Sequence, residues 1–317
     1  METLQNLFIL GFKVLVIRIV IICSTFFIFS LTDNTENKIY SKAIHHLHKN
    51  DEFYLSSSQK GSKERLSILR TNSPSVKYLR LSDIVFIGNS RPLLGLDSDS
   101  ISKFSSKTKF NIFNLSFDYS DNKNLGLWIL ENNKITPKYL LIHVGPYIFM
   151  DDFSPRSFRS ISNGLWANSI EFYDFQISSL LNLHAYSFLG KTRFSPQSFF
   201  MYRSKKNGCI KLLANIEQND FSYKSKSENL PNYAKEVALS FLAWARKHSI
   251  KPILFQVPAP DLNPFLVSSL AKYLGIPFIL SPEGKYYSYD NSHLTPSSSK
   301  TFTNNLLNQL ESLFEHY

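Results

Sequence analysis

The sequence predicts an α/β fold in which a parallel sheet is covered by helices on both faces. From Asp83 onward, short apolar runs alternate with stretches of helical periodicity, and this alternation is typical of strand–helix–strand units. The chain has 317 residues, of which 43% are hydrophobic and 19% are charged. That composition belongs to a folded chain, long enough for one large domain or two small ones.

Five apolar runs are expected to form the sheet, and three amphipathic stretches are expected to form covering helices. The expected strands are residues 84–88, 110–115, 139–144, 252–257 and 276–280. The expected helices are residues 122–133, 232–248 and 296–314. The last of these has apolar residues on one side, which predicts a buried face; they are Phe302, Leu306, Leu307, Leu310 and Leu313.

An apolar segment near the N-terminus, residues 7–31, predicts a transmembrane anchor within residues 1–32. Lys13 and Arg18 interrupt it, but no charged residue occurs from Ile19 to Leu31, so the segment spans a bilayer if those two side chains snorkel. Basic residues on its N-terminal side favour a cytoplasmic N-terminus and a domain outside the cytoplasm. A cleaved signal peptide is the alternative, and both interpretations export the rest of the chain.

The rest of the chain is expected to be a stalk or linker at 33–80 and an α/β domain at 81–317, interrupted by an insertion at 146–231. The linker contains His45, His46 and His48 without acidic or cysteine partners at a suitable spacing, so we expect a solvated helix there and no metal site. The insertion is rich in Phe, Tyr, Ser and Arg, and we expect it to be partly helical around 170–183. It could form a lid or polymer-binding wall over the strand ends, or only add packing.

The net charge is +10, which suits an anionic membrane surface or an anionic polymer as well as nucleic acid. The basic residues are scattered, so a solvated basic surface with no such partner is the simpler alternative. The sequence has no zinc-ligand spacing and no nucleic-acid-binding motif, so we discount nucleic acid as a partner. Its two cysteines, Cys23 and Cys209, are not expected to pair, because the first lies in the apolar segment. We expect no cofactor.

The stretch Gly88-Asn89-Ser90-Arg91-Pro92 directly follows the first expected strand. Glycine and asparagine permit a tight turn, and the proline restricts Arg91 to extended geometry. Ser90 is therefore expected on a sharp turn at the carboxyl end of a strand, where open α/β sheets bind ligands. A turn serine without a role in chemistry is the simpler alternative.

The stretch Asp290-Asn291-Ser292-His293 lies near the other end of the chain, just before a helix that Thr295 and Pro296 are suited to begin. Residues three apart can face the same side, so Asp290 can orient one imidazole nitrogen of His293 while the other reaches a serine. Ser90 would then be the nucleophile, His293 the general base and Asp290 the orienting acid of an acyl-transfer triad. A surface or capping histidine is the alternative.

These two blocks, in this order and context, resemble the first and last blocks of the SGNH/GDSL hydrolase superfamily. With its anchor and insertion, the chain is similar to membrane-anchored members that work on cell-surface polymers, such as the alginate O-acetylation proteins and the protein that assists D-alanylation of teichoic acids. The resemblance covers residues 83–145 and 235–317. It implies a three-layer, flavodoxin-like fold and an oxyanion hole built from Ser90 and two later blocks. In the second block the family has glycine, and this chain has Ser116. In the third block the family has asparagine, and this chain has Gly145 but no asparagine.

The resemblance implies a membrane-anchored serine esterase or O-acyltransferase that acts on a surface polysaccharide or similar polymer through an acyl-serine intermediate. A transferase would need a multi-span membrane-bound O-acyltransferase as its partner, because one span cannot carry an acyl group across a bilayer. Asn89 and Arg91 are candidate substrate-binding residues, and Arg91 suits a carboxylate, a phosphate or a nearby acidic side chain. His143 is interpreted as a satisfied core residue. The alternative function is a non-catalytic assembly or polymer-binding protein, which the missing asparagine favours.

Overall fold

The computed structural model describes residues 53–58, 61–62, 64–69, 73–118, 123–145, 155–189, 200–213, 219–224 and 232–315. The predicted anchor at 1–32 and the three histidines of the predicted linker lie outside these ranges. Within the described part of the chain, no helix is both long enough and apolar enough to cross a membrane.

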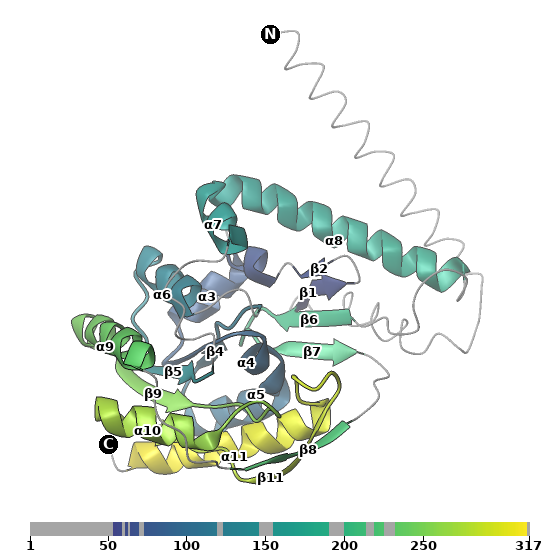
Figure 1. The fold of residues 1–317 in the computed structure, drawn as a ribbon. Coiled ribbons are helices and arrows are strands. Elements are labelled where there is room, and N and C mark those ends of the chain that lie inside the picture. Colours follow the sequence, from purple (N-terminus) through teal and green to yellow (C-terminus); the bar gives the residue numbers. More distant parts are fainter. Residues whose placement is uncertain are drawn as a thin grey trace.

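A five-stranded parallel sheet forms the centre of the domain (Figure 1). Its strands stand in the order β10 (Phe278–Ile279), β9 (Lys251–Phe255), β5 (Tyr139–His143), β3 (Ile84–Ile87) and β4 (Ile112–Asn114). All neighbouring pairs are parallel, and the register sets Phe86 beside both Asn114 and Leu141. These are the five strands that the sequence predicts, each somewhat shorter than expected.

Helices cover both faces of the sheet, because successive side chains of each strand point to opposite faces. Val85 and Ile87 of β3 join a core with α3 (Pro74–Arg80), α6 (Lys123–Asn132), α9 (Asn232–Lys247) and α10 (Pro264–Leu274). Ile84 and Phe86 join a second core with α5 (Ser98–Thr108) and α11 (Pro296–Glu315), on which α4 (Ser90–Gly95) also packs. The predicted α/β architecture with a parallel sheet is confirmed.

Four of these helices, α3, α4, α5 and α10, are not among the expected ones, although α5 and α10 have clear local start signals. Asp97 begins α5 by accepting a hydrogen bond from the Ser100 amide at 2.8 Å, and Asn263 begins α10 by accepting one from the Phe265 amide at 3.0 Å. These carboxylate and amide oxygens satisfy N–H groups that have no partner inside the helix. Gly275 ends α10 in the left-handed conformation, with φ of 64°.

The insertion at 146–231 contains α7 (Pro155–Ser162), α8 (Gly164–Leu189), β6 (Phe200–Ser204), β7 (Ile210–Leu213) and β8 (Asn219–Tyr223). Part of the segment expected to be a stalk is folded against it. β1 (Phe53–Ser58) pairs with β6 and with β2 (Gly61–Ser62), which gives an antiparallel sheet in the order β2-β1-β6-β7. The 3-10 helix η2 (Glu64–Ser67) packs on α8. Because β6 lies far along the chain, no local signal could have shown the partner of β1.

Two contacts fasten the insertion near the carboxyl end of the central sheet. Arg203 of β6 is fully buried, and its guanidinium donates hydrogen bonds to the backbone oxygens of Asn114 at 2.8 Å and Ser116 at 3.0 Å. β8 pairs antiparallel with β11 (Gly284–Ser288), which leads directly to Asp290 and His293. The insertion therefore contacts both segments next to the candidate site.

Candidate active site

Ser90 is the first residue of α4, immediately beyond the turn that ends β3. Asn89 begins this helix, and its side-chain oxygen accepts a hydrogen bond from the Arg91 amide at 3.1 Å. The expectation of extended geometry at Arg91 is wrong, because this cap draws Arg91 and Pro92 into the first turn of α4, where proline is tolerated. Ser90 itself is half-buried, whereas Asn89 is buried. The Asn89 side chain thus holds the turn, and its predicted contact with substrate stays a prediction.

Gly88 is needed at this turn for space. A Cβ atom at position 88 would lie 2.4 Å from Pro92 Cγ and 2.8 Å from His143 Cβ. The turn of β3 therefore packs directly on the end of β5, and a larger residue would push Ser90 away from its present position. The sequence predicted a turn that needs glycine at this position. The structure shows that glycine is needed because α4 and β5 pack closely around its Cα.

The loop between β11 and α11 holds Asp290 and His293 together. Asp290 Oδ1 accepts hydrogen bonds from the His293 amide at 2.8 Å and the Ser292 amide at 3.0 Å. Asn291 takes the left-handed conformation with φ of 60°, which asparagine tolerates better than most residues. The Thr295 hydroxyl accepts from the Ser298 amide at 3.4 Å, and α11 begins at Pro296, as the sequence predicts.

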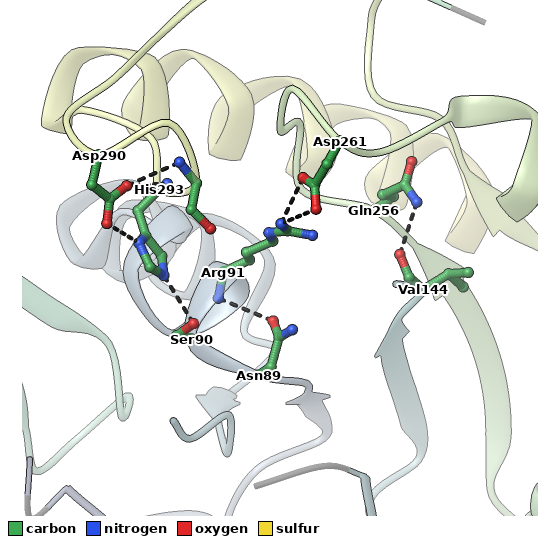
Figure 2. Close-up of polar contacts among 9 residues, drawn as sticks. Asn89, Ser90, Arg91, Val144, Gln256, Asp261, Asp290 and His293 are labelled. Atoms are coloured by element: carbon green, nitrogen blue, oxygen red, sulfur yellow. Dashed lines mark hydrogen bonds and ion pairs between the residues drawn. The ribbon is translucent and has the colours of Figure 1, made fainter. Parts of the chain in front are cut away.

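The structure brings Ser90, His293 and Asp290 together in one chain of hydrogen bonds (Figure 2). His293 Nε2 lies 2.8 Å from Ser90 Oγ, and His293 Nδ1 lies 2.6 Å from Asp290 Oδ2. The Tyr289 ring stacks on the imidazole, with centroids 5.6 Å apart and an angle of 18° between the planes. This arrangement allows the imidazole to accept the serine proton while the carboxylate fixes its tautomer.

Asp290 is ready for that task because it stays ionised. Its partial burial alone would raise the pKa of the carboxyl, but the hydrogen bond from the His293 ring, the charge of that ring and the amides of His293 and Ser292 together lower the pKa. Each of these interactions favours the charged carboxylate over the neutral acid.

The three predicted oxyanion-hole residues differ in what they can donate. The Ser90 N–H is at the first position of α4, where no intrahelical acceptor exists. The Ser116 N–H donates to Asn114 Oδ1 at 3.1 Å, and the buried Ser116 hydroxyl has no hydrogen-bond partner among the described ranges. Gly145 is buried beside His143, since a Cβ at position 145 would lie 3.2 Å from His143 Cε1. Ser90 therefore has the more suitable backbone donor of Ser90 and Ser116, and a donating role for Gly145 stays a prediction.

Arg91 pairs with an acid that the sequence analysis did not identify. Its Nη2 lies 2.6 and 2.7 Å from the two carboxylate oxygens of Asp261, in the loop after β9 (Figure 2). Arg91 is 6% exposed and Asp261 is 57% exposed. Arg91 Nη1 is buried and has no hydrogen-bond partner within the described part of the chain. Of the alternatives left open for Arg91, the acidic side chain is the one present, and recognition of a substrate anion stays a prediction.

His143 is buried directly beneath the turn that carries Ser90. Burial, with a smaller contribution from the Arg91 charge, lowers the pKa of His143 to about 3, so its ring is neutral near pH 7. Its Nε2 has no hydrogen-bond partner among the residues that the structure describes, which corrects the expectation of a fully satisfied core histidine. The ring edge packs on Phe255, with centroids 5.7 Å apart.

Gln256 is a further residue that sequence reasoning missed. Its side-chain amide donates to the Val144 oxygen at 2.8 Å (Figure 2), and its side-chain oxygen accepts from the Tyr223 hydroxyl at 2.6 Å. It thus joins the ends of β5, β8 and β9 beside the site. A buried polar residue directly after an apolar strand was the available signal, but neither Gln256 nor Asp261 belongs to a recognisable motif.

The described residues contain no group of three or more His, Cys, Asp or Glu side chains arranged to hold a metal ion. No family model matches the sequence, and no curated protein matches it either. Among solved structures, the chain is similar to a GDSL-like lipase from Bacteroides thetaiotaomicron, with a TM-score of 0.37 and 13% identity over 76% of this chain and 96% of the other. It is also similar to an acylhydrolase from Bacteroides fragilis described as putative, with a TM-score of 0.37 and 13% identity over 76% of this chain and 94% of the other. At that level of similarity, the roles of individual residues rest on the geometry above.

Proposed function

We propose that this chain is a serine esterase or O-acyltransferase that forms an acyl-Ser90 intermediate. The observation that carries the proposal is the continuous contact from Ser90 Oγ to His293 Nε2 at 2.8 Å and from His293 Nδ1 to Asp290 Oδ2 at 2.6 Å. A serine becomes a nucleophile when a base accepts its proton and a third group orients that base. Here all three groups are at hydrogen-bond distance without any rearrangement.

In the proposed reaction, Ser90 Oγ attacks the carbonyl carbon of an ester while His293 Nε2 takes the serine proton. The ionised Asp290 stabilises the imidazolium that results. The negative oxygen of the tetrahedral intermediate accepts hydrogen bonds from the Ser90 N–H and, in this proposal, from the Gly145 N–H. His293 then returns its proton to the leaving alcohol, and the acyl group remains on Ser90. Water or an acceptor hydroxyl, activated by the same histidine, releases it, so hydrolysis and transfer share this intermediate.

The proposed substrate is an acyl ester on a surface polysaccharide or similar polymer, and the proposed location is outside the cytoplasm on a single membrane anchor. The supporting features are the apolar segment at 7–31, the net charge of +10 and the aromatic insertion. If the chain transfers acyl groups, a membrane-bound O-acyltransferase is the proposed partner that supplies them. These parts of the proposal rest on sequence features and on the resemblance of the two motif blocks.

A non-catalytic assembly or polymer-binding protein is the second candidate, because one feature of the site favours it. The Ser116 N–H is occupied by Asn114, and residues 145–147 contain no asparagine, so two of the three expected oxyanion donors are changed. Loss of one such donor typically reduces the rate about 100- to 1000-fold. An enzyme with such a site would turn over slowly, or the protein would have lost the activity while it kept the fold.

Labelling with a fluorophosphonate probe separates the two candidates. The proposed enzyme should be labelled on Ser90, Ser90→Ala should not be labelled, and Ser106→Ala should behave as the wild type because Ser106 is an exposed residue of α5. Failure of the folded wild-type chain to react would favour the binding protein. Substrate identity requires a second experiment, in which the ester-linked groups of surface glycans are compared between a deletion strain and strains complemented with wild type or Ser90→Ala.

A further inference from the structure

We propose that α7 and α8 present an apolar surface that rests on the lipid bilayer. The surface, called here the α8 surface, consists of Phe158 on α7 and Trp166, Ile170 and Tyr173 on α8, each between 54% and 74% exposed. Exposed apolar side chains are ordinary when scattered, but a contiguous set on one element marks a contact with a partner or a membrane.

The spacing shows that α8 has two apolar sides, and that among the described residues one side is buried and the other is exposed. Phe172 and Phe175 are buried, and Phe172 packs on Leu66 of η2. Trp166, Ile170 and Tyr173 follow the same helical spacing on the opposite side of α8, where they are exposed. An amphipathic surface helix would carry polar residues at those positions.

The inner side of α8 is fixed to the domain by specific contacts, so the outer side is held in a constant direction. Asn168 of α8 donates a hydrogen bond to the Ser160 oxygen at 2.6 Å. Arg65 of η2 donates to the Ser160 hydroxyl at 2.9 Å. Both α7 and α8 are thereby joined to η2, which begins a few residues after β1.

The sequence and the position of α8 favour a bilayer as the occupant of this surface. The first described strand, β1, packs against α8, and the 25-residue apolar segment 7–31 precedes it in the chain. The second half of α8 contains no acidic residue, lysine or arginine between Asp174 and Lys191. Trp and Tyr beside aliphatic residues are also the side chains that gather at the interface of membrane and water. A helix lying in that interface buries its apolar side by about 5–10 Å.

The helix α8 lies at the opposite end of the domain from α10 and α11 (Figure 1). Together with an anchor formed by residues 7–31, it would attach the domain to the bilayer at two points. Two attachment points fix the orientation of the domain, whereas a single flexible tether does not. This inference concerns the surface of the insertion and is independent of whether Ser90 is a nucleophile.

Tryptophan quenching by lipid tests the proposal directly. The chain has three tryptophans, Trp128, Trp166 and Trp244, and the apolar segment at 7–31 has none, so insertion of that segment gives no signal. The full-length chain is reconstituted into vesicles of phosphatidylcholine and phosphatidylglycerol with or without bromine on the acyl chains. The Trp166 emission is obtained as the difference between wild type and Trp166→Phe.

We expect brominated lipid to reduce the Trp166 emission by about half, as for a ring at the boundary of headgroups and acyl chains. Ile170→Trp in the Trp166→Phe background should restore the quenching, since both positions lie on the same side of α8. Tyr273→Trp in that background should not, because Tyr273 is 48% exposed on α10 at the other end of the domain.

Two results would overturn the proposal. If aqueous acrylamide quenches Trp166 equally with and without vesicles and brominated lipid has no effect, the surface faces water. If vesicles or protein concentration shield Trp166 from acrylamide while brominated lipid has no effect, the surface contacts protein, either a second copy or another segment of this chain.

Discussion

His293 Nε2 lies 2.8 Å from Ser90 Oγ, although 203 positions separate the two residues in the chain. Each residue is placed by its own local structure. Ser90 begins α4 at the end of β3, and His293 sits in a loop that Asp290 closes ahead of α11. The two meet because α11 packs on α4, which brings the start of one helix beside the start of the other. The proposed chemistry therefore depends on a helix–helix contact as much as on the residues themselves.

Asp290→Asn should impair the reaction without unfolding the loop. The asparagine oxygen can still accept from the Ser292 and His293 amides, but the charge that stabilises the imidazolium is removed. We expect kcat for an aryl acetate to fall about 100- to 10,000-fold and the thermal unfolding temperature to stay nearly the same. If kcat is unchanged while the protein remains folded, His293 does not depend on Asp290, and the triad assignment is wrong.

Gly88→Ala should move the nucleophile. The added methyl group would lie 2.4 Å from Pro92 Cγ and 2.8 Å from His143 Cβ, and such overpacking costs about 1–3 kcal/mol of stability. We expect a lower urea midpoint and a loss of activity larger than the loss of folded protein. The double variant Gly88→Ala/Pro92→Ala should recover part of the stability, since one of the two clashes is relieved. Wild-type stability in Gly88→Ala would contradict the tight packing of this turn.

Asp261→Asn should leave the buried Arg91 guanidinium without its charged partner. Removing one member of a buried pair costs about 3–5 kcal/mol, but Asp261 is 57% exposed, so solvent reduces the cost to about 1–2 kcal/mol. Urea unfolding provides the measurement. Glu311→Gln is the matched control, because Lys107 and Glu311 form a more exposed pair at 2.8 Å, and we expect it to lose less than about 0.5 kcal/mol. Equal losses of unfolding free energy in the two variants would mean that the Arg91–Asp261 pair stabilises the fold no more than an exposed surface pair.

His143 should make the folded state sensitive to acid. Its pKa is lowered from 6.5 to about 3 in the fold, so between these values the unfolded chain binds more protons than the folded chain. The stability contributed by the neutral ring is therefore present above about pH 6.5 and is lost as the pH falls toward 3. This single group can remove up to about 1.4 kcal/mol per pH unit.

The free energy of unfolding of wild type and His143→Gln, measured from pH 7 to pH 4, checks this expectation. Glutamine does not titrate, so the variant should show a shallower fall in stability, whatever its stability at pH 7. Parallel curves for the two proteins would show that His143 is accessible to protons in the folded state and is not buried as described.

The strands and the two loops of the candidate site could be predicted because their signals are local. Apolar runs end at Gly88 and Gly145, and Asp290, Thr295 and Pro296 are typical of a turn followed by a helix start. In a parallel sheet the ends of such strands meet at one edge, so their side chains could be expected close together. The sequence also offered an acidic side chain as one partner for Arg91, but it did not indicate which one.

What the sequence did not show depends on contacts between distant segments. The pairing of β1 with β6 places part of the expected stalk in the fold, although β6 lies far from Phe53–Ser58 in the chain. Asp261 meets Arg91 only because β9 lies beside β5 in the sheet. The Ser116 N–H is lost as a donor because Asn114, two residues earlier, accepts from it. These are properties of tertiary packing, which residue patterns do not contain.

The most direct test of the central claim is to look for the covalent intermediate on Ser90. The wild-type protein is mixed briefly with an aryl acetate, quenched in acid, digested and analysed by mass spectrometry. The proposed mechanism predicts an acetyl ester on the Ser90 side chain, present in wild type and in Ser106→Ala and absent in Ser90→Ala and His293→Ala. A folded, monodisperse wild-type protein that releases no aryl alcohol and carries no acetyl group on Ser90 would contradict it.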